Sequence, residues 1–316
     1  MNYFVSVVVI SYNAKDDLKN CLSSLEKQTY PNLEIIVVND ASTDGTKEFL
    51  SGFKSNTLDK LIIVNNGSNL GVAGARNVGI SHADGDIIAF TDADCITDPH
   101  WISELIQGYE DKNVVAVGGG IFSDRVTNVW ELLHKGHDFI AKEEGYVTYI
   151  QGCNMSFDAA TLKSFMFNDE IKYGYEETLL CDDLIQAGYN IYFRPQAIVN
   201  HRHRTTFCAT AKQKYKRGLS SIWYRKKKNM LPMFKRHIIL FLAILLIPFY
   251  LISNIIPYLI LLLFLVFFIS LLRDEMTYKK NNLVEVALTF PFLLIIEFFH
   301  FTGSIAGLIK FRVLRG

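Results

Sequence analysis

The sequence predicts an α/β protein with a mostly parallel sheet, followed by membrane helices towards its C-terminal end. Three observations lead to this prediction. Short apolar, β-branched runs alternate with segments of helical periodicity in the N-terminal part of the chain. Polar clusters follow these apolar runs, at the strand ends where open α/β sheets bind ligands. From about residue 238 onward, long and nearly uncharged apolar stretches dominate.

Each N-terminal element is predicted from a local pattern. Continuous apolar runs typical of strands buried on both faces lie at residues 5–10, 33–38, 61–64 and 87–90. Helical spacing and turn signals predict helices at residues 18–25, 46–53 and 75–81. Asp98 and Pro99 are expected to begin another helix, as its N-cap and first helical residue. This alternation implies a sheet with helices on both faces.

Two aspartates, Asp92 and Asp94, follow the fourth predicted strand with one residue between them. Residues i and i+2 of a strand point to the same side, so both carboxylates are expected to face one point. Mg2+ and Mn2+ take such oxygen ligands and often bridge carboxylates to phosphates. Because a solvated turn with two acids shows the same pattern, the prediction depends on the neighbouring motifs.

Polar residues also follow the first and second predicted strands. Ser11, Tyr12 and Asn13 come directly after the first strand, and Asp40 comes after the second. The carboxyl ends of parallel strands share one edge, so these side chains are expected to converge on the crevice of the two aspartates. There Asp40 is expected to bond a base or a ribose.

Two further polar residues are open to more than one interpretation. Asp44 either contributes to the same crevice or caps the next helix. Arg76, in a glycine-rich stretch after the third strand, is expected either to pair with a phosphate or to orient an aspartate. The glycines of this stretch do not have the G-x-G-x-x-G spacing of dinucleotide sites, which disfavours a nicotinamide cofactor.

The charge distribution points to a membrane surface. Residues 184–236 contain no Asp or Glu but many Lys and Arg, although the whole chain has a formal net charge of zero. Such a basic stretch fits either nucleic acid or anionic lipid headgroups. The apolar region that follows favours lipid, and no nucleic-acid partner is expected. The basic residues beside the first apolar run place the N-terminal part on the cytoplasmic side.

A cytoplasmic setting is also expected from the cysteines and the N-terminus. The five cysteines are odd in number and have no zinc-site spacing, which is typical of reduced thiols. The first ten residues lack the pattern of a secretory signal peptide.

Two apolar runs, 238–252 and 255–272, are together too long for one span of about 20 residues. They predict a hairpin of two membrane helices, with one long tilted helix as the alternative. Residues 283–309 are also apolar but carry Glu285, Glu297 and His300. This segment is either a third span or an interfacial helix. The interfacial placement is favoured because a third span would put the basic C-terminal residues outside.

The strand-end motifs read SVVVISYN, VVNDASTDGT, NLGVAGARNVG and FTDADC. Together they resemble the successive motifs of the family-2 glycosyltransferases, which have the GT-A fold. The resemblance covers about residues 5–205, and the combination is far more specific than any motif alone. It implies that Asp40 holds the nucleotide base, and that Asp92 and Asp94 hold the ribose and a Mg2+ or Mn2+ ion on the donor diphosphate. Ser11, Tyr12, Asn13 and Arg76 are assigned to the same donor nucleotide.

The resemblance continues in two later segments. Gly152, Cys153 and Asn154 are similar to the family's small-residue segment that lines the donor and acceptor sugars. The stretch GYEETLLC is similar to the segment that carries the family's catalytic base. This implies Glu177 as the base, in place of the usual Asp, or Glu176 in a shifted register. The alternative is an acidic helix N-terminus stabilised by the helix dipole.

A histidine pair follows the strand-like residues 197–199. Many members of the family carry a histidine here that approaches the metal or the diphosphate, which implies this role for His201 or His203. His201 is favoured, and the alternative is a basic surface loop. A Gln-x-x-Arg-Trp element of processive synthases is matched poorly, because Gly218 stands in the place of the Trp.

These inferences predict three regions: a GT-A domain at 1–205, a basic juxtamembrane segment at 206–236 and a membrane region at 237–316. The resemblance implies inverting, metal-dependent transfer of a sugar from a nucleotide-diphosphate sugar to a hydroxyl acceptor. The expected acceptor is a lipid-linked or cell-surface glycan at the cytoplasmic membrane face. The alternatives are a polyprenyl-phosphate sugar synthase, whose anionic acceptor needs no base, and a non-catalytic nucleotide-sugar-binding scaffold.

Overall fold

The computed structural model describes residues 2–55, 60–135, 143–170, 172–230, 239, 246, 255–273 and 283–311. The chain divides into two compact units. The first, called here the sheet domain, comprises Met1–Arg125 and Asp138–His203. The second, called here the helical domain, comprises Val126–His137 and Arg204–Gly316. The boundary after His203 lies close to residue 205, but the sequence pattern did not predict that the segment after Arg125 belongs to the second unit.

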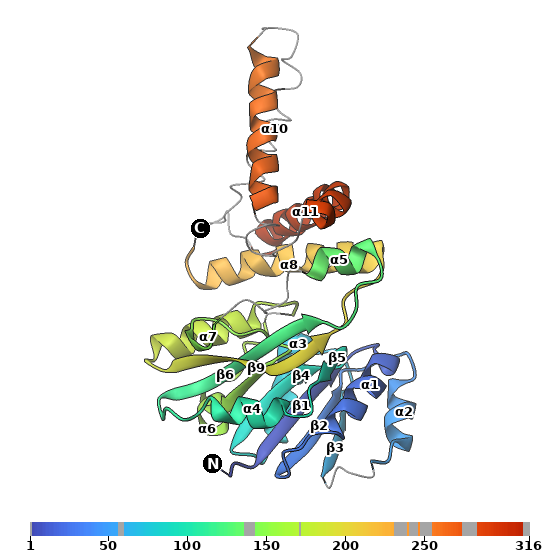
Figure 1. The fold of residues 1–316 in the computed structure, drawn as a ribbon, viewed down its shortest axis with the longest axis vertical. Coiled ribbons are helices and arrows are strands. Elements are labelled where there is room, and N and C mark those ends of the chain that lie inside the picture. Colours follow the sequence, from blue (N-terminus) through green and yellow to red (C-terminus); the bar gives the residue numbers. More distant parts are fainter. Residues whose placement is uncertain are drawn as a thin grey trace. The chain divides into compact units, whose positions relative to one another are not determined.

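The sheet domain is built on a mixed sheet of nine described strands, in the order β3-β2-β1-β4-β8-β6-β9-β5, with β7 paired to β9 (Figure 1). The strands are β1 (Val5–Ser11), β2 (Leu33–Asn39), β3 (Leu61–Asn65), β4 (Ile87–Asp92), β5 (Cys95–Thr97), β6 (Val114–Ser123), β7 (Gly145–Val147), β8 (Met155–Asp158) and β9 (Asn190–His201). Strands β1 to β4 pair in parallel, as predicted. Strand β8 joins antiparallel to β4 and β6, which makes the second half of the sheet mixed.

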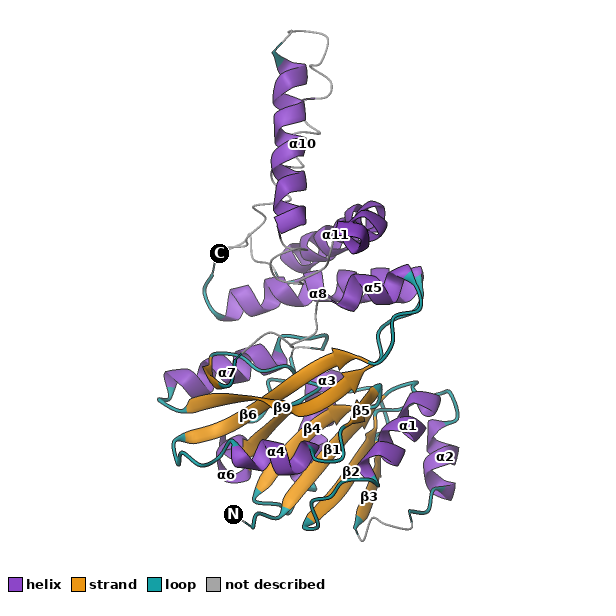
Figure 2. Cartoon of the chain, viewed as in Figure 1, coloured by secondary structure: helices purple, strands orange, loops and turns teal. Residues whose placement is uncertain are grey.

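Helices cover both faces of this sheet (Figure 2). They are α1 (Lys15–Leu25), α2 (Thr46–Gly52), α3 (Gly71–Ser81), α4 (Trp101–Gln107), α6 (Ala159–Phe165) and α7 (Glu176–Gln186). Side chains of β1 alternate between the faces. Val7 belongs to the buried cluster that includes residues of α1, α2 and α4, whereas Val8 belongs to the cluster that includes residues of α3, α6 and α7. Burial on both faces explains why these strands read as continuous apolar runs.

The predicted start of the helix at Asp98 is wrong. The helix α4 begins at Trp101, and Asp98 and Pro99 lie before it. The Asp98 carboxylate accepts a hydrogen bond from the His100 backbone N–H at 2.8 Å, and the Trp101 N–H donates to the Asp98 carbonyl at 3.0 Å. These two bonds close a turn ahead of the helix. The Asp-Pro pattern therefore marks a turn here, a role that both residues also favour.

The helical domain contains α5 (Val129–Lys135), α8 (Phe207–Lys227), α10 (Ile256–Arg273) and α11 (Leu283–Lys310) among the described residues. Helices α8 and α11 approach each other so closely that glycine is required at the contact. A Cβ atom at Gly218 would lie 2.0 Å from the His300 carbonyl oxygen, and one at Gly303 would lie 2.0 Å from the Tyr215 carbonyl oxygen. Small residues permit such close backbone contact. A tryptophan at position 218 could not be accommodated here.

Within the described residues, one helical segment, Pro291–Lys310, is long and apolar enough to cross a membrane by length and composition. The apolar segment Ile256–Ser270 of α10 is shorter. The predicted span 238–252 lies outside the described residues, apart from two isolated positions. Several membrane helices are therefore not established.

Candidate active site at the carboxyl edge of the sheet

The loops after β1 and β2 are tied together where these strands end. The Asn13 side-chain oxygen accepts a hydrogen bond from the Thr43 N–H at 2.7 Å, and the Asn13 N–H donates to Ser42 Oγ at 2.9 Å. Ser11 is buried, and its hydroxyl has no hydrogen-bond partner among the described residues, whereas Tyr12 is 53% exposed. A buried hydroxyl without a partner is uncommon and can be satisfied by a ligand.

The carboxylate of Asp40 is already hydrogen-bonded within the sheet domain. One oxygen accepts bonds from Asn66 Nδ2 and the Leu70 N–H, both at 2.9 Å, and the other accepts from the Gly71 N–H at 3.0 Å. Gly71 begins α3 with a positive φ of 79°, a conformation that favours glycine. Asp40 therefore holds the N-terminus of α3 in place, a role the sequence pattern did not indicate.

Asp44 caps two helices, which is one of the two roles predicted for it. Its carboxylate accepts hydrogen bonds from the Thr46 N–H at 3.1 Å and from the Lys15 N–H at 2.9 Å, the first residues of α2 and α1. Burial raises the pKa of Asp44, but these hydrogen bonds outweigh it and lower the pKa below its ordinary value.

Arg76 forms hydrogen bonds with three separate segments at the carboxyl edge of the sheet. It is 2% exposed, and its guanidinium donates to Glu176 Oε1 at 2.7 Å, to Asp92 Oδ1 at 3.3 Å and to the Gly152 carbonyl at 3.0 Å. The Cζ atom of its guanidinium group lies 5.6 Å from the centre of the Phe167 ring, in a cation–π contact. Of the two roles predicted for Arg76, the structure shows the pairing with an aspartate.

Gly152 leaves the space that the guanidinium of Arg76 occupies. A Cβ atom at Gly152 would lie 2.7 Å from Arg76 Nη2. Its neighbour Asn154 is fully buried and uses its amide group within the fold, accepting from Trp101 Nε1 and donating to the Gly120 and Ala197 carbonyls. The structure therefore does not bring Asn154 into the crevice, where it was predicted to line a sugar pocket.

The two carboxylates after β4 occupy different positions. Asp92 is the last residue of β4, whereas Asp94 lies in the tight turn between β4 and β5. The strand-alternation argument therefore does not apply to Asp94, although the two charges are near enough to interact. Burial raises the pKa of Asp92, and so does the Asp94 carboxylate, against the opposing effect of Arg76.

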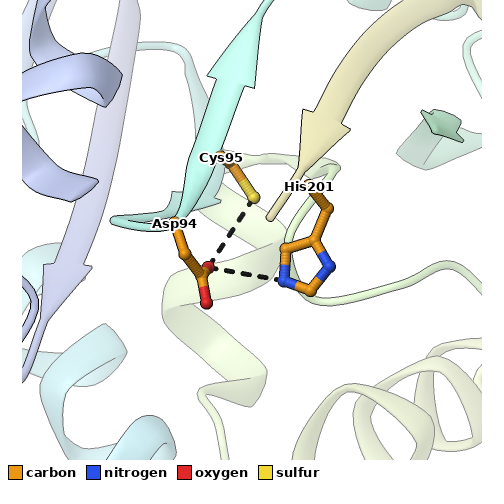
Figure 3. Close-up of side chains that lie close together, drawn as sticks. All are labelled: Asp94, Cys95 and His201. Carbon is orange, nitrogen blue, oxygen red and sulfur yellow. Dashed lines mark hydrogen bonds and ion pairs between the residues drawn. The ribbon is translucent and has the colours of Figure 1, made fainter. Parts of the chain in front are cut away.

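Asp94, Cys95 and His201 form a compact cluster (Figure 3). Asp94 Oδ1 lies 3.4 Å from His201 Nε2 and 4.0 Å from Cys95 Sγ, and all three ligand atoms lie within 4.8 Å of one another. Burial lowers the pKa of His201, but the Asp94 carboxylate outweighs it and raises the pKa to about 10. This carboxylate, imidazole and thiol fit a divalent cation in spacing and in chemistry.

The structure distinguishes the two histidines between which the sequence left a choice. His201 faces Asp94, whereas His203 Nε2 lies 2.8 Å from Ser123 Oγ. The two rings meet edge to face with centroids 4.9 Å apart. His201 is therefore the histidine of the cluster, and His203 contacts the ring of His201.

Glu176 and Glu177 begin α7, after Tyr175 in the left-handed conformation with a φ of 75°. Glu176 is buried against Arg76, and burial together with the Glu177 carboxylate raises its pKa from 4.5 to about 8. Glu177 is less buried, and its Oε1 accepts a hydrogen bond from the Tyr149 hydroxyl at 3.1 Å. Tyr149 was not predicted as a site residue, since a lone tyrosine in a loop gives no sequence signal.

A separate cleft lies away from these groups. It has a volume of about 570 Å3 and lies along α3, between Asn69, Asn77 and Lys172. None of the acidic residues at the carboxyl edge lines it. The candidate site is therefore defined by its converging charged groups. The cluster of Asp94, Cys95 and His201 lies at one end and the pair of Glu176 and Glu177 at the other. Arg76 contacts both Asp92 and Glu176 and so connects the two ends.

Comparison with known proteins assigns this sheet domain to a known group. Residues 6–171 match the family model described as Glycosyl transferase family 2. The chain is 37% identical over 120 residues to Glycosyltransferase AglE of Haloferax volcanii, covering 37% of this chain and 39% of AglE. It is 26% identical over 228 residues to the Glucosyl-dolichyl phosphate glucuronosyltransferase of the same organism, covering 64% of this chain and 71% of that protein. The match to AglE thus spans about two fifths of that relative.

The fold also matches a solved structure over nearly the whole chain. The mannosyltransferase PcManGT from Pyrobaculum calidifontis, solved in complex with GDP-Man and Mn2+, aligns with a TM-score of 0.61 and 18% identity. The alignment covers 98% of this chain and 88% of that one. At this identity the similarity concerns the fold alone.

Proposed function

The chain belongs to glycosyl transferase family 2, whose model matches more than half of its 316 residues, and from this premise we propose that it is an inverting, metal-dependent glycosyltransferase. Its sheet domain has the α/β GT-A fold. The proposed reaction transfers a sugar from a nucleoside-diphosphate sugar to a hydroxyl group. The observation that carries the proposal is the link that Arg76 makes between Asp92 at the end of β4 and Glu176 at the start of α7.

Asp94 and His201 are the proposed metal ligands, and Asp92 is proposed to hold the donor ribose. The spacing of the first two supports this assignment, since Asp94 Oδ1 and His201 Nε2 lie 3.4 Å apart. When bound, a divalent ion such as Mn2+ or Mg2+ would neutralise the charge of the departing diphosphate. Arg76 stabilises the site because its guanidinium donates hydrogen bonds to the Asp92 carboxylate and the Gly152 carbonyl and holds both in position.

Glu177 is the proposed general base. Its carboxylate would take the proton from the acceptor hydroxyl while the hydroxyl oxygen forms a bond to the anomeric carbon. The bond between that carbon and the diphosphate oxygen breaks in the same step, and its electron pair leaves with the diphosphate. Displacement from the opposite side inverts the anomeric configuration. The Tyr149 hydroxyl, 3.1 Å from Glu177 Oε1, would hold the base in orientation.

The proposed location is the cytoplasmic face of a membrane. Helix α8 is rich in Lys and Arg, and its residues around Gly218 pack directly against the backbone of α11 around Gly303. A helix with so many charges is unfavourable in the hydrocarbon core, so this part of α11 is proposed to lie at the interface beside α8.

A lipid-linked or cell-surface glycan is the proposed acceptor, in keeping with the lipid-linked acceptor named for the glucuronosyltransferase relative.

Turnover of nucleotide sugars by the detergent-solubilised full-length protein tests the proposal. UDP- and GDP-linked sugars are supplied with Mn2+, and release of the nucleoside diphosphate is measured with and without an added lipid-linked acceptor. We expect release from at least one donor, its loss with a chelator, and its loss in Asp94→Asn. Release that is unaffected by the chelator and by Asp94→Asn would contradict metal-dependent transfer. Full turnover by both Glu176→Gln and Glu177→Gln would instead favour a polyprenyl-phosphate sugar synthase.

A further inference from the structure

We propose that Cys95 is a third ligand of the metal site and that the site consequently binds thiophilic ions such as Zn2+ and Co2+ in preference to Mg2+. The inference rests on the proposed metal site and extends it by a residue and by a chemical preference. It concerns a thiol of this chain that the family resemblance did not assign.

The pairing of β5 with β9 places this thiol beside the imidazole. Cys95 and His201 are direct partners in the antiparallel pairing of these strands. Residues directly opposite each other in an antiparallel pair project from the same face of the sheet. Figure 3 shows the Cys95 sulfur and a ring nitrogen of His201 both facing one oxygen of the Asp94 carboxylate. The backbone register, and not only the side-chain rotamers, therefore brings the three groups together.

The distances fit tetrahedral coordination after a small adjustment. Zinc bonds of about 2.0–2.2 Å to nitrogen and oxygen and about 2.3 Å to sulfur separate neighbouring ligand atoms by about 3.4 to 3.6 Å. The observed distance from His201 Nε2 to Asp94 Oδ1 is 3.4 Å, and that from Cys95 Sγ to Asp94 Oδ1 is 4.0 Å. The sulfur therefore has to approach the carboxylate oxygen by about 0.4 Å and the imidazole nitrogen by at most about 1.2 Å, since the three ligand atoms lie within 4.8 Å of one another.

The ligand atoms decide which ion is preferred. Carboxylate and water suit Mg2+, whereas a thiolate together with imidazole suits Zn2+ and related ions. Cys95 is 1% exposed, and burial, together with the nearby Cys153 thiol and Asp94 carboxylate, holds the pKa of its thiol well above the ordinary value. A divalent ion supplies the positive charge that offsets loss of the thiol proton in such a buried site.

Cobalt substitution tests the proposal by a spectroscopic signal that does not depend on activity. The full-length protein is used in a Cys208→Ser background, because Cys208 is the exposed cysteine and would bind ions adventitiously. After metal removal, Co2+ is added, and its visible d–d absorption reports binding, while an ultraviolet charge-transfer band reports a sulfur ligand. We expect the charge-transfer band in the parent protein, its loss in Cys95→Ser, and its persistence in Cys181→Ser, a matched buried cysteine in α7.

Competition measurements then quantify the preference. Loss of an outer-shell partner of a metal ligand lowers metal affinity by roughly 10- to 100-fold. Cys95→Ser removes a direct ligand and should weaken Zn2+ binding by at least as much, while Mg2+ binding should change by less than about twofold. Bound Co2+ without a charge-transfer band in the parent protein would overturn the proposal without the use of any variant. A band that survives Cys95→Ser but disappears in Cys153→Ser would also overturn it, by assigning the sulfur to Cys153.

The outcome is independent of whether the proposed function holds. If Co2+ or Mn2+ supports sugar transfer but no sulfur band is seen, the transferase proposal stands and the Cys95 proposal fails. If the band is present but no nucleotide sugar is turned over with any ion, the Cys95 ligand stands and the transferase proposal fails.

Discussion

The buried carboxyl group of Glu176 should make the stability of the sheet domain depend on pH. Glu176 is 3% exposed, and burial with the neighbouring Glu177 raises its pKa from 4.5 to about 8 in spite of Arg76. A carboxyl group with a raised pKa holds its proton more tightly in the folded state. Its contribution to stability is therefore complete below about pH 4.5 and is lost as the pH rises towards 8. Each pH unit within this window lowers the free energy of unfolding by about 1.4 kcal/mol. The loss between about pH 5 and pH 7 is therefore about 3 kcal/mol.

The Glu176→Gln substitution removes this titration while keeping a side-chain oxygen that can accept the hydrogen bond from Arg76. Relative to the wild type, the free energy of unfolding of the variant should rise by about 3 kcal/mol between about pH 5 and pH 7. Urea unfolding in detergent measures this difference. With Trp130 and Trp223 replaced by Phe, the fluorescence of Trp101, which is fully buried in the sheet domain, reports on that domain.

The matched control is Glu48→Gln, since Glu48 is an exposed residue of α2. The difference in unfolding free energy between this variant and the wild type supplies the baseline at each pH. The difference in unfolding free energy between Glu176→Gln and the wild type could instead stay as constant from about pH 5 to pH 8 as it does for Glu48→Gln. Glu176 would then be ionised in the folded protein as in the unfolded chain. That result would refute the raised pKa and the reasoning from burial.

Three further predictions concern the base, the helix contact and the topology. Glu177→Gln should lower turnover by about 100- to 10,000-fold in single-turnover assays with little change in donor binding, and a larger effect of Glu176→Gln would move the base to Glu176. Gly303→Ala should destabilise the helical domain by about 1–3 kcal/mol in thermal unfolding, because its Cβ would clash with the Tyr215 carbonyl. Gly67→Ala, at a site with open space, is its control, and equal stabilities would contradict the close contact. A cysteine at Lys227, in a Cys208→Ser background, should resist impermeant reagents added outside intact cells, and its labelling would place α8 outside.

The N-terminal half of the sheet could be predicted because its strands are buried on both faces. Strands such as β1 and β2 are continuous apolar runs, and the polar residues at their ends follow from parallel topology. The start of α4 was misplaced because Asp-Pro is compatible with both a helix start and a turn. Only the hydrogen bond from the His100 N–H to Asp98 decides between them.

The candidate site could be predicted only where a motif carries it. Asp92 and Asp94 were identified from their spacing after a strand and His201 from the resemblance, and the structure brings Asp94 and His201 to within 3.4 Å. The contacts between distant segments were beyond the sequence. Arg76 and Glu176 are a hundred residues apart along the chain, and the hydrogen bond between them depends on how α3 and α7 pack. The same holds for Cys95, which reaches His201 only through the register of β5 and β9.

Gly218 shows how a structural requirement can be read as a missing motif. Its sequence position suggested a departure from the processive synthases, where a Trp is found. The structure supplies a local reason, since the His300 carbonyl of α11 leaves no room for a side chain. The glycine is therefore required by helix packing, whatever the chemistry at the active site.

Binding of nucleoside diphosphates is the measurement that tests the central claim most directly. The claim is that the carboxyl edge of the sheet binds a donor diphosphate through an ion held by Asp94. Isothermal titration of the full-length protein with UDP and GDP, with and without Mn2+, compares the wild type with Asp94→Asn. The account predicts binding of at least one diphosphate that requires Mn2+ and is lost in Asp94→Asn even when Mn2+ is present. Diphosphate binding of equal strength without the ion and in Asp94→Asn would contradict it.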